Sequence, residues 1–181
     1  MGCAMVLWVT GLSGSGKTTL CRALCDLLKP RLPELVLLDG DEIRKLFGDD
    51  LDHTEPSRRI QIERLRRLSE FLVHQGQIVV VAALYSHADL SAANRKTLPG
   101  YFEIYLEASL DLVSRRDSKG LYAGAAAGRI PNVVGIDIPW HAPASADLVL
   151  RADAGTTPAE MALQVARRVP RLSAALVEAT T

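Results

Sequence analysis

A glycine-rich segment near the start of the chain has the composition of a phosphate-binding loop. Residues 11–18 read Gly-Leu-Ser-Gly-Ser-Gly-Lys-Thr and follow an apolar run at 5–9. Glycines let backbone N–H groups turn towards phosphate oxygens, while Lys17 can reach the β- and γ-phosphates and Thr18 can ligate Mg²⁺. A helix that begins here adds its positive dipole end. The segment predicts binding of a nucleoside triphosphate, and an ordinary glycine-rich turn is the alternative.

Two carboxylates follow the second apolar run of the chain, at 35–38. Asp39 and Asp41 are separated by Gly40, at the edge where open parallel sheets bind their ligands. From such a turn, one carboxylate could hold metal-bound water while the other accepts a proton from an attacking hydroxyl. The alternative is a turn that caps a helix starting at Glu42.

Two arginines are candidates for binding an anionic substrate. Arg44 lies one helical turn after Asp41 and could pair with a substrate phosphate. In the helix expected at 56–75, Arg58 falls on the apolar stripe, one turn before Ile62. A guanidinium at that position either snorkels to solvent or binds an anion in a cleft.

Residues 117–146 form a long stretch rich in Gly, Ala and Pro, with little periodicity. Loops of this length are usually lids or binding loops, and we expect a lid over the phosphate site. Arg116 and Lys119 lie where the chain enters this segment, and such cations could stabilise charge on a transferring phosphoryl group. They could equally form a charged last turn of a helix. The residues expected to bind ATP are Gly11, Ser13, Gly14, Ser15, Gly16, Lys17, Thr18, Thr19 and Arg116.

Short apolar runs alternate with amphipathic segments along the whole chain. The runs are continuous rather than alternating, as in parallel strands covered on both faces. This order predicts one α/β domain over residues 1–181, with a five-stranded parallel sheet and helices on both faces. Strands are expected at 5–10, 35–38, 77–83, 102–106 and 147–150, and helices at 17–29, 42–47, 56–75, 88–97, 109–117 and 158–169.

The composition is typical of a globular protein and limits the partners. The 181 residues are 48% hydrophobic with a formal net charge of zero, so neither long nucleic acids nor anionic membranes are expected partners. With no membrane-length apolar segment and no signal peptide, a cytoplasmic location is expected. Cys3, Cys21 and Cys25 are expected to be reduced thiols in the core, with a metal or redox pair as the alternative.

Four blocks, in order, resemble the adenylylsulfate (APS) kinase family over nearly the whole chain. They lie at 8–19, 38–44, 116–122 and 135–143. The resemblance implies a P-loop nucleotide-kinase-like fold, Mg²⁺ with ATP as donor, a homodimer, and transfer to a ribose 3′-hydroxyl. It also implies that Asp41 is the carboxylate near that hydroxyl. Arg44 and Arg58 resemble the family's acceptor-binding arginines, and Lys119 belongs to the lid.

The departures from the family pattern gather at the acceptor site. His53 and Val133 stand where the family has two aromatic residues that clamp the acceptor's adenine. Losing two Phe faces removes roughly 0.5–1.5 kcal/mol of stacking each, beyond the area that they bury. Tyr85 aligns with a family serine, with Ser86 as its neighbour, and Gln61 replaces an asparagine.

The donor half therefore matches the family while the base-reading half differs. This predicts a kinase for a small nucleotide other than APS, such as cytidine diphosphoramidate, and APS kinase activity is the alternative. A nucleotide-dependent switch or ATPase is disfavoured because the run at 78–83 ends without an acid. A non-catalytic binding module, a sugar kinase and a seryl-tRNA kinase are further alternatives.

Besides the ATP-binding residues, three sets of site residues are predicted. The catalytic set is Lys17, Asp39 and Asp41, and the metal ligand is Thr18. The acceptor-binding set is Asp41, Arg44, His53, Arg58, Gln61, Tyr85, Ser86, Lys119, Leu121 and Val133.

Overall fold

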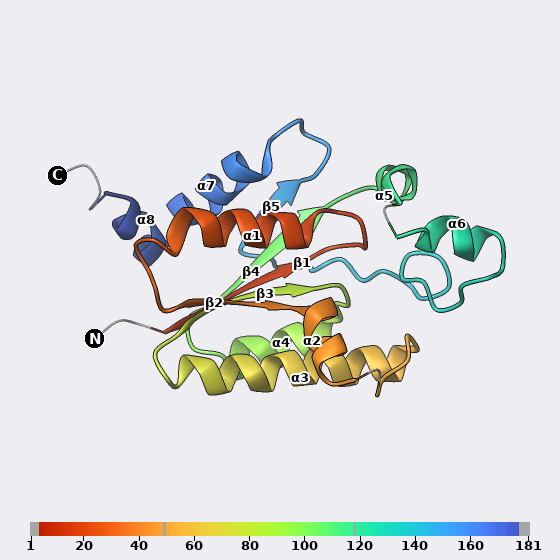
Figure 1. The fold of residues 1–181 in the computed structure, drawn as a ribbon, viewed down its shortest axis with the longest axis horizontal. Coiled ribbons are helices and arrows are strands. Elements are labelled where there is room, and N and C mark those ends of the chain that lie inside the picture. Colours follow the sequence, from red (N-terminus) through yellow and green to blue (C-terminus); the bar gives the residue numbers. More distant parts are fainter. Residues whose placement is uncertain (1–3, 49, 118, 178–181) are drawn as a thin grey trace.

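The computed structural model describes residues 4–48, 50–117 and 119–177, so Cys3 and Ser118 lie outside the described residues. Its five strands form one parallel sheet in the order β2-β3-β1-β4-β5, which confirms the predicted α/β class (Figure 1). The strands are β1 (Met5–Thr10), β2 (Leu35–Asp39), β3 (Ile78–Ala83), β4 (Tyr101–Glu107) and β5 (Leu148–Arg151).

Helices cover both faces of the sheet. One face carries α1 (Lys17–Leu28), α7 (Pro158–Arg168) and α8 (Pro170–Val177), and the other carries α2 (Gly40–Leu46), α3 (Glu55–Val73) and α4 (Ala88–Thr97) (Figure 1). Every residue of β1 and β3 is buried, because both faces of these central strands are covered. Cys21 and Cys25 are free thiols on α1, and Cys21 lies in the core. None of the helices in the described part of the chain is long and apolar enough to cross a membrane.

The register of the central strands brings the candidate residues to one edge of the sheet. Thr10 of β1 lies opposite Ala83 of β3, and Asp39 of β2 lies opposite Ala82. The chain leaves β1 for a helix on one face and leaves β3 for a helix on the other face (Figure 1). Ligands of open α/β sheets bind at the carboxyl ends of the strands, where neighbouring strands lead to helices on opposite faces.

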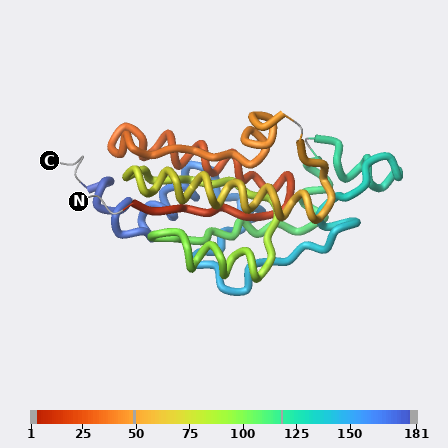
Figure 2. Tube along the Cα trace, turned by 90° about the horizontal axis from the view of Figure 1, so that it is seen from below, coloured from red at the N-terminus to blue at the C-terminus, as the bar shows by residue number. Residues whose placement is uncertain are grey.

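Two helices were not predicted from the sequence. The segment at 117–146 contains α6 (Leu121–Ala126), which follows α5 (Leu110–Arg116), and α8 follows α7 near the C-terminal end. A helix as short as α6 is too brief for an apolar stripe of period 3.6 to be recognised. Its N-terminus is instead set by Asp117, whose carboxylate accepts bonds from the backbone N–H groups of Tyr122 and Ala123 over 3.1 and 2.9 Å. Figure 2 shows this segment at the end of the molecule opposite the two chain termini.

Candidate active site

The glycine-rich segment forms a tight loop between β1 and α1. Gly14 and Gly16 have φ angles of 75° and 104°, in the left-handed region that favours glycine. The Lys17 ammonium donates to the Leu12 carbonyl over 2.8 Å, and its burial lowers the pKa of Lys17 to about 8 despite the nearby Asp41. Within the described residues the buried Ser15 hydroxyl has no hydrogen-bond partner, so a phosphate oxygen in the loop could satisfy it.

Thr18 and Asp39 connect the phosphate loop to the end of the second strand. The Thr18 hydroxyl donates to Asp39 Oδ2 over 2.6 Å. Asp39 Oδ1 accepts bonds from the backbone N–H groups of Asp41 and Glu42 over 2.9 and 3.4 Å, which caps α2. The Asp39 carboxylate therefore both caps α2 and lies beside the phosphate loop. A hydroxyl and a carboxylate oxygen this close are hard oxygen donors of the kind that Mg²⁺ takes.

Asp41 lies among cations from three elements. Lys119, at the start of the expected lid segment (117–146), forms an ion pair with Asp41, and Lys17 and Arg44 are close enough to act on the same carboxylate. Burial of Asp41 favours its neutral form, but the hydrogen bond and charge of Lys119 hold the pKa of Asp41 below its usual range. Asp41 is therefore ionised near neutral pH.

Arg44 and Arg58, the two arginines expected to bind the acceptor, both donate hydrogen bonds to backbone carbonyls. Arg44 donates to the carbonyls of Leu51 and Asp52 over 3.0 and 2.8 Å. Arg58 is 8% exposed and donates to the His53 carbonyl over 3.0 Å, and to the Asn132 carbonyl over 2.8 Å. The placement of Arg58 on the apolar stripe thus corresponds to a buried guanidinium that joins the start of α3 to the lid segment.

The other residues expected to bind the acceptor differ in their exposure and in their partners. His53 is exposed, and its pKa is lowered by partial burial and by Arg44 and Arg58. Gln61 is buried and donates to the Gly40 carbonyl over 2.9 Å, so it supports the turn between Asp39 and Asp41. Tyr85, Ser86 and Val133 are buried, and Leu121 is half-buried at the start of α6.

The lid segment packs against the phosphate loop. The Tyr122 hydroxyl donates to the Ser13 carbonyl over 2.9 Å. A Cβ at Gly135 would lie 3.3 Å from the side chain of Leu12, so the returning half of the segment also lies close to the loop. Tyr122 lies in the block at 116–122 that resembles the family but was not among the predicted site residues, because its contact depends on the direction of a helix that was not predicted.

A small cavity lies beside the phosphate loop on the side away from Asp41. Its volume is about 180 Å³, and Arg116 lines it. Arg116 donates to the carbonyls of Ser15 and Ala152 over 3.4 and 3.0 Å. The remaining lining residues are Ser15, Gly16, Thr19, Leu20, Leu106, Ala152, Thr156, Pro158 and Met161. The sequence analysis did not include the lining residues at 152–158. They follow the last strand directly, at the edge of the sheet where ligands bind, and this position could have indicated them.

The strand order, the phosphate loop and the carboxylates at the neighbouring strand end define a P-loop kinase. Known proteins agree with this class. The sequence model for adenylylsulphate kinase matches residues 3–151, and the chain belongs to that family. It is therefore an ATP-dependent kinase of the APS-kinase type.

Relatives with two different names are almost equally similar to the chain. Cytidine diphosphoramidate kinase of Campylobacter jejuni is 40% identical over 148 residues, which cover 80% of this chain and 84% of that protein. Adenylyl-sulfate kinase of Deinococcus deserti is 38% identical over 153 residues, which cover 84% of each chain. The structure of Mycobacterium tuberculosis APS kinase CysC in complex with AMPPNP and APS superposes with a TM-score of 0.85 at 32% identity, covering 94% of this chain and 99% of that one.

Proposed function

We propose that this kinase transfers the γ-phosphoryl group of ATP to the ribose 3′-hydroxyl of a small nucleotide whose base is not held by an aromatic clamp. The observation that carries the proposal is the position of Asp41. This ionised carboxylate lies among Lys17 of the phosphate loop, Arg44 of α2 and Lys119 of the lid. A hydroxyl bonded to Asp41 would face the donor phosphates, while the same cations would neutralise the transferring group.

In the proposed reaction, the residues of this chain position groups and stabilise charge. Lys17 and the backbone N–H groups of the loop hold the β- and γ-phosphates, and Asp41 orients the acceptor hydroxyl and accepts its proton. Lys119 releases Asp41 as the acceptor binds and then contacts the transferring phosphoryl group. Arg44 and Arg58 bind the anionic part of the acceptor.

Thr18 and Asp39 are the residues that would hold Mg²⁺. The Thr18 hydroxyl would be a direct ligand, and Asp39 would accept bonds from the ion's water molecules. The ion, when bound, neutralises charge on the β- and γ-phosphate oxygens. On the far side of the loop, the cavity lined by Arg116 and Thr19 would take the base of ATP.

We favour a cytidine diphosphoramidate-type acceptor over APS. His53 and Val133 supply no pair of aromatic faces for a purine, and a smaller pyrimidine needs less stacking area. The similarity to the C. jejuni enzyme supports the same choice. APS remains the alternative acceptor because APS kinases are nearly as similar.

The test is an ATP-consumption assay with purified protein and Mg²⁺. APS, cytidine diphosphoramidate and simple nucleoside diphosphates are compared by kcat/KM. Turnover of the cytidine compound well above that of APS supports the proposal. Efficient turnover of APS with no turnover of cytidine diphosphate derivatives contradicts it, and rapid ATP hydrolysis without any acceptor would indicate a switch or ATPase.

Two broader expectations belong to the same proposal. We propose that the enzyme is a homodimer, which sedimentation analysis would test. We also propose that it works in the cytoplasm, because its donor is ATP and Cys21 is a free thiol in its core. A disulfide-bonded form isolated from cells would contradict the second expectation.

A further inference from the structure

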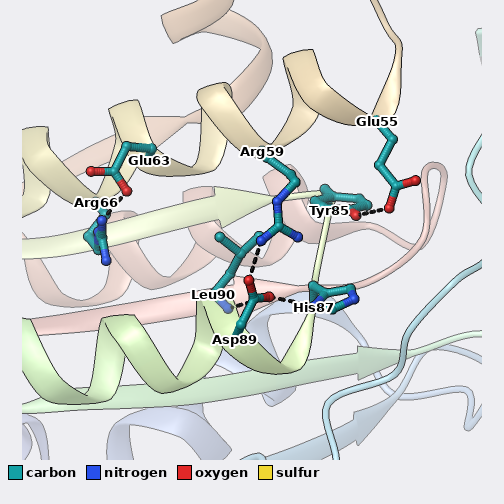
Figure 3. Close-up of polar contacts among 8 residues, drawn as sticks. All are labelled: Glu55, Arg59, Glu63, Arg66, Tyr85, His87, Asp89 and Leu90. Carbon is teal, nitrogen blue, oxygen red and sulfur yellow. Dashed lines mark hydrogen bonds and ion pairs between the residues drawn. The ribbon is translucent and has the colours of Figure 1, made fainter.

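Tyr85 and Glu55 form a polar pair at the edge of the sheet where the acceptor is expected. Tyr85 follows β3 and is 3% exposed, and its hydroxyl donates a hydrogen bond to Glu55 Oε1 (Figure 3). Glu55 is the first residue of α3 and is exposed. A buried phenol therefore fixes the orientation of a carboxylate that solvent, or a ligand, can reach.

This pair adjoins the residues assigned to the acceptor. Arg58 lies one helical turn after Glu55, and its charge and the Tyr85 hydroxyl are close enough to influence each other. The Arg58 guanidinium holds the carbonyls of His53 and Asn132, which belong to the two segments that stand in for the aromatic clamp. The acceptor's base would therefore enter between these segments, beside Glu55.

The Glu55 carboxylate keeps an open hydrogen-bonding position. Within the described residues, Glu55 forms no ion pair, and the bond from Tyr85 is the one hydrogen bond to its side chain. Arg59 is the neighbouring cation in Figure 3, but it pairs with Asp89, which also bonds to His87. Arg59 also lies close enough to act on the Tyr85 hydroxyl, but none of the described residues bonds to the Oε2 atom of Glu55, which is left to accept a bond from a ligand. An ionised carboxylate only accepts hydrogen bonds, so its ligand must present N–H or O–H groups.

We propose that Glu55, oriented by Tyr85, accepts a hydrogen bond from the exocyclic amino group of the acceptor's base. This inference rests on the proposed transfer to a nucleotide. It selects cytosine or adenine, which carry such an amino group, over uracil or hypoxanthine, which present a carbonyl at the same position. Glu55 is then a specificity-determining residue, and Tyr85 is the residue that positions it.

The test compares matched acceptors on the wild-type protein and on Glu55→Gln. The pairs are cytidine and uridine 5′-diphosphates, and APS with its inosine counterpart. An amide can both donate and accept, so Glu55→Gln should lower the kcat/KM preference for the amino base by about tenfold. Turnover of the uridine compound should rise, which simple damage to the site would not produce.

Two further variants separate positioning from structure. Tyr85→Phe should reduce the same preference by a smaller factor, mainly through the acceptor KM. Glu70→Gln makes the same chemical change at the far end of α3 and should leave the preference unchanged. Thermal unfolding of each variant confirms that it is folded.

The inference and the proposed function fail in different ways. If the wild-type enzyme turns over an amino-base nucleotide but Glu55→Gln keeps the same preference, Glu55 does not read the base and the proposed function stands. If no nucleotide is phosphorylated, the proposed function fails. Calorimetric binding of cytidine and uridine diphosphates then decides the inference, and equal affinities in the wild-type protein overturn it.

Discussion

The Thr18 hydroxyl donates a hydrogen bond over 2.6 Å to the Asp39 carboxylate, which also caps α2. Thr18 lies in the first turn of α1, and Asp39 ends β2, so the bond joins two strand-to-helix connections across the edge of the sheet. One oxygen of Asp39 serves the phosphate loop and the other serves the backbone of α2. The two roles can be separated by mutation.

Asp39→Asn and Asp39→Ala should differ from each other in stability, whereas their effects on activity should be the same. Asparagine is as good a helix cap as aspartate, whereas alanine removes the cap and should cost about 1 kcal/mol of unfolding free energy. Both substitutions remove the charge expected to hold the water shell of Mg²⁺, so both should raise the Mg²⁺ concentration needed for turnover. Urea unfolding and Mg²⁺ titration of the kinase rate measure the two effects. Equal stability of the two variants would show that the cap contributes nothing.

Asp41→Asn should abolish transfer while leaving ATP binding intact. Asparagine keeps the shape but accepts a proton poorly, so kcat should fall by about 10²- to 10⁴-fold. The substitution also frees Lys119 from its ion pair, and ATP affinity measured by calorimetry should therefore stay equal or increase slightly. Near-full turnover by Asp41→Asn would remove this residue from the proposed mechanism.

ATP affinity should fall as the pH rises through about 8. Burial lowers the pKa of Lys17 to about 8 in the free protein, so its ammonium is charged below that pH and loses its proton above it. Phosphate binding requires the charged form, and the affinity should drop by up to about tenfold per pH unit above the pKa. Calorimetry at pH 8 in buffers of different ionisation enthalpy should detect proton uptake on ATP binding. Lys17→Met should bind weakly with no such uptake.

The phosphate loop and the turn at 39–41 could be placed in the fold from the sequence because their signals are local. The loop at 11–18 and the turn at 39–41 are each defined by a few adjacent residues after an apolar strand, and the continuous apolar runs predicted the parallel sheet. The place of Arg58 also followed from the sequence, since helical periodicity alone puts it on the buried stripe.

The lid and the base-reading region depend on contacts between distant segments, which no local pattern encodes. Tyr122 reaches Ser13 because of α6, and Tyr85 meets Glu55 because β3 ends and α3 begins at the same edge of the sheet. Similarly, the sequence suggested that Arg58 could bind an anion but could not reveal that it already holds the Asn132 carbonyl. In the proposed function, acceptor choice depends on these features.

Arg58→Lys should weaken acceptor binding and loosen the lid without affecting the donor side. The Arg58 guanidinium donates to the His53 and Asn132 carbonyls at once, and a lysine has one ammonium that cannot match this fork. We expect the acceptor KM to rise by at least about tenfold while the KM for ATP stays unchanged, and amide exchange around Asn132 to become faster. Arg67→Lys, on an exposed part of the same helix, is the control and should behave like the wild-type protein. If Arg58→Lys raised both KM values equally, the guanidinium would act on the whole site rather than on the acceptor half.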